Sequence, residues 1–175
     1  TAATSAFDKR TMLYGLHKAI DAIREQDTAV IVEGYMDAIA AHQFGYTNVV
    51  ASMGTALTEQ QVSQLKSLAT NFVLALDPDD AGREATLRSL ESSWRVRDHQ
   101  TLSGTKHSTG LLYRWKPFTL KIAALPPGKD PDGLIREDAR EWERFLREAK
   151  PLLDYYIEMV SSRFDLETGE GKARA

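Results

Sequence analysis

Residues 28–45, TAVIVEGYMDAIAAHQFG, decide the fold class, because their hydrophobic pattern changes within a few positions. Residues 29–32 form a short apolar run that is typical of a buried strand. Residues 36–44 have the composition of a helix, and Gly45 ends it. The stretch therefore predicts a strand and a helix joined by a short turn that contains Glu33 and Gly34.

The same alternation continues along the chain. Further strands are expected at 48–51, 72–76 and 118–124, and helices at 11–25, 80–94, 139–149 and 151–163. A capping box, with Thr58 at the N-cap and Gln61 three residues later, begins another helix that has Val62, Leu65 and Leu68 on one face. Alternating strands and helices predict right-handed βαβ units and an α/β fold with a mostly parallel sheet of about four strands.

Composition narrows the function classes. The 175 residues suffice for about one domain or one domain with an appendage. The absence of cysteine excludes disulfides, zinc ribbons and thiol catalysis. The net charge of −3 argues against a protein that only grips nucleic-acid phosphates, but it permits an acidic site filled with cations. The apolar runs are too short to span a membrane, and no secretory signal is visible.

Acidic side chains follow three of the four expected strands. They are Glu33 and Asp37 after the first strand, Asp77 and Asp79 after the third, and Asp130 and Asp132 after the fourth. The carboxyl ends of parallel strands share one edge of a sheet, which is where ligand sites gather. Because close carboxylates repel one another, this edge predicts a site for a hard divalent cation such as Mg²⁺.

The residues around these acids support close approach of a ligand. Asp77 and Asp79 point to the same side if the backbone stays extended, and Pro78 favours that extension. Gly34 and Gly82 remove side chains beside acidic residues.

Each feature also has a purely structural explanation. Residues 77–80 could form a turn and an N-cap, residues 33–34 a strand-end turn, and residues 130–132 a turn that opens a helix. Arg83 could pair with a neighbouring aspartate, Lys129 and Arg136 could be solvated, and Tyr35 and Met36 are expected to be packing residues. The ordered combination favours a functional site.

The order of Glu-Gly after one strand and Asp-x-Asp after a later one resembles the signature of the Toprim domain. Longer strings resemble the bacterial DnaG-type primases in particular. They are LYGL at 13–16, VEGYMD at 32–37, VASMGTALT at 50–58, LDPDDAGR at 76–83 and PGKDPD at 127–132. The resemblance covers roughly residues 7–160.

The resemblance implies a Toprim, Rossmann-like fold and RNA primer synthesis on a single-stranded DNA template from ribonucleoside triphosphates. It implies that Glu33, Asp77 and Asp79 are catalytic and hold Mg²⁺ or Mn²⁺, with two ions expected, and that Asp37, Asp130 and Asp132 lie nearby. Lys129 and Arg83 would contact phosphates. A replicative helicase would bind through a region absent here, and the location would be the bacterial cytoplasm, in the nucleoid and replisome.

The resemblance also implies that the chain is a fragment. Residues 1–26 would contain a helix that ends the preceding subdomain, 27–136 the Toprim core with an inserted loop near 95–116, and 137–175 an appendage of helices. The family's zinc-binding domain, most of its basic subdomain and its helicase-binding region are missing, so we expect little or no primer synthesis by this chain alone.

Two other functions stay open. One is a Toprim nuclease or a topoisomerase-like DNA-breaking domain, although nothing marks Tyr35, Tyr113 or Tyr155 as a catalytic tyrosine. The other is a non-catalytic interaction module in which the acids are structural and bind no metal.

Overall fold

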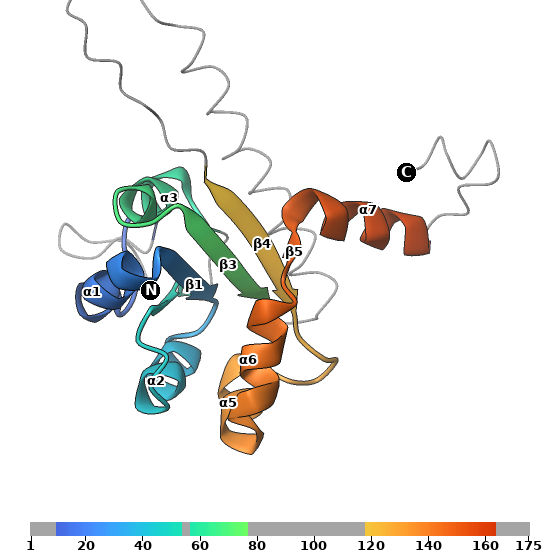
Figure 1. Ribbon diagram of the computed structural model, residues 1–175, viewed down its shortest axis with the longest axis horizontal. Coiled ribbons are helices and arrows are strands. Elements are labelled where there is room, and N and C mark those ends of the chain that lie inside the picture. Colours follow the sequence, from blue (N-terminus) through green and yellow to red (C-terminus); the bar gives the residue numbers. More distant parts are fainter. Residues whose placement is uncertain (1–9, 54–56, 77–117, 164–175) are drawn as a thin grey trace, which may run out of the picture.

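The strands lie between two layers of helices (Figure 1). The structure, a computed structural model, describes residues 10–53, 57–76 and 118–163. Four strands are parallel, in the order β2-β1-β3-β4: β1 (Thr28–Val32), β2 (Val49–Ala51), β3 (Asn71–Leu76) and β4 (Thr119–Ala124). The predicted α/β class with a mostly parallel sheet is confirmed.

A fifth strand extends the sheet beyond the four expected from the sequence. β5 (Lys150–Pro151) is two residues long and pairs antiparallel with β4, with Lys121 opposite Pro151 and Ile122 opposite Lys150. Proline has no N–H to donate, so it is tolerated at a sheet edge such as this one. Pro151 was expected only to separate two helices, and it does so while it also pairs with the sheet.

One face of the sheet is covered by α1 (Leu16–Gln26), α3 (Glu59–Lys66) and α7 (Leu152–Arg163). Alternate strand residues, such as Ile31, Leu74 and Ile122, point to this side and form one apolar cluster with Ile23 of α1 and Leu65 of α3. All of these side chains are less than 4% exposed. Because side chains alternate along a strand, the residues between them supply the opposite face.

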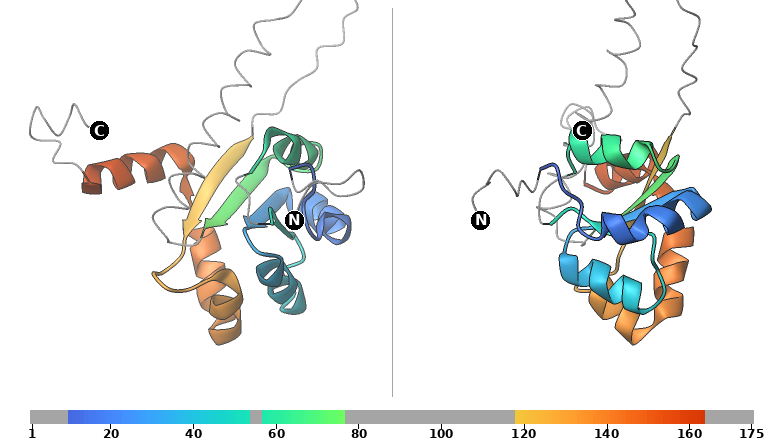
Figure 2. Two further views of the ribbon diagram at one scale, coloured as in Figure 1. Left: turned by 180° about the vertical axis from the view of Figure 1, so that it is seen from behind. Right: turned by 90° about the vertical axis from the view of Figure 1, so that its left-hand side faces the viewer.

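The other face is covered by α2 (Tyr35–Gln43), α5 (Pro131–Glu137) and α6 (Ala139–Arg147), which lie together below the sheet in Figure 1 and again in Figure 2. α2 meets the sheet through the small residues Ala38 and Ala41, and α6 inserts Trp142, whose side chain is 0% exposed. The two C-terminal helices α6 and α7 therefore pack on opposite faces of the sheet.

The N-terminal helix is shorter than the expected 11–25. α1 begins at Leu16, after Gly15 adopts a positive φ of 79°. Tyr14 forms an isolated antiparallel bridge with Ala51, in which the two N–H···O bonds are 2.9 and 3.1 Å long. Leu13 is only 7% exposed, so its apolar character reflects burial beside the sheet rather than a helical position.

The other boundaries fall close to the expected ones, and the capping box at Thr58 and Gln61 is confirmed, with the Gln61 N–H donating to Thr58 Oγ1 over 3.2 Å. The expected helix at 80–94 and the inserted loop lie outside the described residues. The assignment of residues 1–26, 27–136 and 137–175 to separate parts stays a prediction. Within the described part of the chain, no helix is long and apolar enough to cross a membrane.

Candidate functional site

The turn after β1 carries Glu33 and leads into α2. Gly34 is the N-cap of α2, and Asp37 is the third residue of the helix. The carboxylate of Asp37 turns back so that Oδ2 accepts a hydrogen bond of 3.0 Å from the Gly34 N–H. A Cβ atom on Gly34 would lie 2.8 Å from that oxygen, closer than real contacts allow. Glycine is therefore needed here for close approach of a carboxylate, and not for an unusual φ.

The turn after β4 carries the second group of acids. Asp130 is the N-cap of α5, and its Oδ1 accepts a hydrogen bond of 2.7 Å from Gly133 N. Pro131 follows as the first helical residue, where a missing N–H costs nothing. Asp132 Oδ1 accepts a hydrogen bond of 2.6 Å from Arg136 Nε. Residues 130–132 thus do open a helix, as their structural explanation has it, and a role for these acids near a metal stays a prediction.

Two basic side chains, Lys129 and Arg136, pair with acidic residues of α5. Lys129 forms an ion pair with Glu137 across α5, and Arg136 pairs with Asp132 one turn away. Both basic side chains are at least 40% exposed, so these pairs are worth at most about 1 kcal/mol each and can open at little cost. The phosphate-binding role expected for Lys129 stays a prediction.

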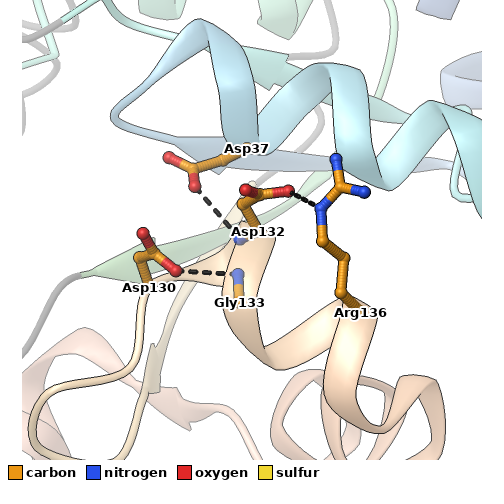
Figure 3. Close-up of polar contacts among 5 residues, drawn as sticks. All are labelled: Asp37, Asp130, Asp132, Gly133 and Arg136. Carbon is orange, nitrogen blue, oxygen red and sulfur yellow. Dashed lines mark hydrogen bonds and ion pairs between the residues drawn. The ribbon is translucent and has the colours of Figure 1, made fainter.

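Asp37 joins the two turns (Figure 3). While Oδ2 binds Gly34, Oδ1 accepts a hydrogen bond of 3.1 Å from the backbone N–H of Asp132, which is 95 positions away in the sequence. The residue is only 9% exposed. Burial raises the pKa of Asp37 above its usual value; the two backbone hydrogen bonds oppose this rise, and the charges of Asp130 and Asp132 add to it.

The end of β3 lies between these two turns. β3 pairs with β1 on one side and with β4 on the other, where Leu76 is opposite Ala124. Asp77, Asp79 and Arg83 follow in the sequence but lie outside the described residues, so their approach to Glu33 stays a prediction. Within the described ranges, no three His, Asp or Glu side chains are grouped so that they could hold a metal ion. The expected metal site would therefore need the acids that follow β3 in the sequence, and it stays a prediction.

Two side chains expected to pack are exposed instead. Tyr35 is 55% and Met36 49% exposed, because they occupy the first turn of α2 while the alanines of that helix face the sheet. The ring of Tyr35 lies beside that of Tyr14, with the centroids 6.0 Å apart.

Sequence reasoning missed Gly133, whose Cβ would lie 2.7 Å from Asp130 Oδ1. Its signal was available, since a glycine three residues after an N-cap aspartate leaves room for the capping oxygen. The sequence also gave no sign that Asp37 contacts the other turn.

The chain thus has an α/β fold with a parallel sheet whose carboxyl edge carries acidic turns. A sequence model described as Toprim-like matches residues 30–135, which is more than half of the chain. The chain is therefore a member of the Toprim-like family.

Within that family, the chain is similar to bacterial DNA primases. It is 38% identical to the DNA primase of Clostridium acetobutylicum over 168 residues, which cover 95% of this chain and 25% of that protein. It is 34% identical to the DNA primase of Escherichia coli K12 over 172 residues, which cover 98% of this chain and 27% of that protein. The chain thus spans about a quarter of the length of these relatives.

Solved structures give the same result. The structure of the DnaG catalytic core matches with a TM-score of 0.76 and 32% identity, over 99% of this chain and 51% of that one. A DnaG primase catalytic domain bound to single-stranded DNA matches with a TM-score of 0.75 and 32% identity, over the same shares of the two chains.

Proposed function

We propose that this chain is the metal-binding part of a DNA primase catalytic core, which makes RNA primers on single-stranded DNA by nucleotidyl transfer. The observation that carries the proposal is the match of 99% of the chain to a solved primase catalytic domain that is bound to single-stranded DNA. The acids at the carboxyl edge of the sheet supply a chemical reason, because carboxylate oxygens are the ligands that Mg²⁺ and Mn²⁺ prefer.

The donor set fits a hard divalent cation. Glu33 directly follows β1, and the described acids Asp37 and Asp130 lie close enough for the charge of Asp130 to raise the pKa of Asp37. Such mutual repulsion is relieved when a cation is bound. We propose that Glu33, Asp77 and Asp79 would hold two ions. When bound, these ions would activate the attacking 3′-hydroxyl and stabilise the leaving pyrophosphate.

The chain's own residues would then orient the reactants. Asp130 caps α5 by accepting the hydrogen bond from Gly133 N, and this contact would help to hold the turn after β4 that also carries Asp132. Lys129 would contact phosphates after leaving Glu137, and Arg83 would do so from the segment after β3. Template, ribonucleoside triphosphates and the RNA primer are the proposed partners, in the cytoplasm of a bacterium, at the nucleoid and replisome. A replicative helicase would bind elsewhere on the longer protein.

The first test is metal binding. Mn²⁺ is titrated into the 175-residue chain by calorimetry, and the titration is repeated with Glu33→Gln and Asp77→Asn. We expect both variants to bind at least tenfold more weakly, because each loses an anionic ligand. Asp21→Asn is the matched control, since Asp21 is an exposed acid on α1, which carries none of the proposed ligands. It should bind as the unchanged chain does.

The outcomes separate the candidate functions. Absence of binding at millimolar Mn²⁺, both with and without a nucleoside triphosphate, would refute the metal site and favour the interaction module. Nicking of DNA, or a covalent adduct with it, in the presence of Mn²⁺ would favour the DNA-breaking alternative. Specific binding without DNA breakage supports the primase proposal. A chain that by itself made primers efficiently would contradict the expectation that synthesis needs the rest of the catalytic core.

A further inference from the structure

Asp37 has contacts that a metal ligand would not need. Both of its oxygens already accept hydrogen bonds from backbone N–H groups, one from Gly34 and the other from Asp132. The two donors belong to different turns, one after β1 and the other after β4; Figure 3 shows the contact with Asp132. With a side chain that is only 9% exposed, Asp37 offers little surface to a ligand from solvent.

We propose that Asp37 is a positioning residue, which locks the turn that carries Glu33 to the turn that carries Asp130 and Asp132. The purpose of the lock, which is to support metal binding, rests on the function proposed above. The lock itself is a property of the metal-free chain. Asp37 would act through these backbone contacts and would not touch the ions.

A carboxylate suits this role better than any neutral side chain. The N–H groups of Gly34 and Asp132 belong to the N-cap of α2 and the first turn of α5, where no carbonyl within the helix can accept them. An anion at a helix N-terminus is also favoured by the helix dipole, and bonds to a charged acceptor are stronger than neutral ones. Asparagine has the same shape, but only one acceptor oxygen, and its NH₂ group would face the second N–H.

The backbone around the carboxylate leaves room for it to approach the Gly34 N–H closely. Gly34 makes room, because a Cβ atom there would lie 2.8 Å from Oδ2. α2 and α5 also pack directly against each other, on the same face of the sheet. β3 lies between β1 and β4, so the lock holds the turns on either side of the end of β3 at one spacing. Metal sites depend on such supporting contacts, whose loss typically costs about 10–100-fold in affinity.

The decisive experiment measures amide hydrogen exchange by NMR on the metal-free 175-residue chain and on Asp37→Asn. We expect the amides of Gly34 and Asp132 to exchange about tenfold faster or more in the variant, because each loses a charged acceptor. Unchanged exchange at Asp132 would overturn the proposal. Gly34→Ala is a second variant that keeps the carboxylate but displaces it, and it should also speed exchange at Asp132.

Metal affinity tests the purpose of the lock. Mn²⁺ should bind Asp37→Asn about 10–100-fold more weakly. Asn48→Ala is the matched control for stability, because Asn48 is 7% exposed and its Nδ2 donates to the Thr28 carbonyl at the opposite end of the strands. That variant should lose stability and keep its metal affinity.

The two readouts distinguish the possible failures. Weakened metal binding with unchanged exchange at Asp132 would make Asp37 a direct ligand and overturn the positioning role. Faster exchange with unchanged metal affinity would also overturn it, since the lock would then serve only stability. If exchange is faster in Asp37→Asn but even the unchanged chain binds no metal, the proposed function is refuted, while the lock between the turns stands.

Discussion

Replacing Gly34 with alanine tests the contact that joins the two acidic turns. Gly34 has φ −95° and ψ 146°, an extended conformation that alanine adopts freely, so the substitution causes no backbone strain. The added Cβ would lie 2.8 Å from Asp37 Oδ2, and an ordinary contact begins at 3.4 Å. The carboxylate must therefore withdraw by roughly half an ångström or more, away from the Gly34 N–H that donates a hydrogen bond to it.

The expected change in the free energy of unfolding follows from two opposing effects of the substitution. Loss of a hydrogen bond to a charged group costs about 1.5–3 kcal/mol. Replacement of glycine by alanine at a compatible conformation returns about 0.4–1 kcal/mol, because the unfolded chain loses freedom. The net expectation is that Gly34→Ala lowers the free energy of unfolding by about 1–2 kcal/mol.

Urea unfolding of the four proteins in a double-mutant cycle measures the effect. The cycle contains the unchanged chain, Gly34→Ala, Asp37→Asn and the double variant. In the Asp37→Asn background the bond to Gly34 is already weakened, so adding the alanine should cost little or should stabilise by up to about 1 kcal/mol. Additive effects of the two substitutions, or a Gly34→Ala chain as stable as the original, would refute the reasoning.

Three further predictions concern other contacts. Thr58→Ala should cost about 1 kcal/mol of stability in urea unfolding, because α3 loses its N-cap acceptor, whereas Thr58→Ser should cost much less. Trp142 is fully buried, and no described residue accepts a hydrogen bond from its Nε1. Trp142→Ala should therefore cost about 3–5 kcal/mol, and Trp142→Phe clearly less, since it also removes a buried donor without a partner; equal losses would contradict this. Burial raises the pKa of Asp37 in the folded state, so the stability linked to its protonation is fully present below the unfolded value of 3.8 and is lost as the pH rises through the folded pKa, while the hydrogen bonds from Gly34 and Asp132 to the carboxylate remain. Urea unfolding of the unchanged chain and of Asp37→Asn at a series of pH values measures this effect. The difference between their free energies of unfolding should change in this direction as the pH rises, and parallel curves would contradict the prediction.

The sheet could be predicted from the sequence because its strands are buried on both faces. Such strands appear as continuous apolar runs, and β1 and β3 were placed within one residue of their ends. The same reasoning missed β5, because two residues at a sheet edge leave no hydrophobic pattern. It also began α1 too early, since Leu13 is buried at helical spacing without being helical.

The site could be predicted only in outline. Strand order brings the turns after β1 and β4 to one edge, and an alternating sequence predicts that much. The contact between Asp37 and Asp132 could not be predicted, because it joins residues 95 positions apart through a backbone N–H, a donor that every residue except proline has. For the same reason, the sequence did not distinguish Asp37, which is buried between two turns, from the more exposed acids around it.

The parallel pairing of the strands also constrains how the chain reaches its fold. β1 meets β2 at a separation of 19 positions, as in the pair Val30 and Val49, but it meets β3 at 43, as in Thr28 and Asn71. β4 pairs with β3 at a separation of 48, as in Asn71 and Thr119. Closing a loop costs entropy before the favourable contacts between its ends can form, and sheets built from distant segments consequently fold slowly. Yet the closure entropy grows only slowly, by about 0.6 kcal/mol for each doubling of a flexible loop, so the pairings of β1 with β3 and of β3 with β4 cost little more to close than that of β1 with β2.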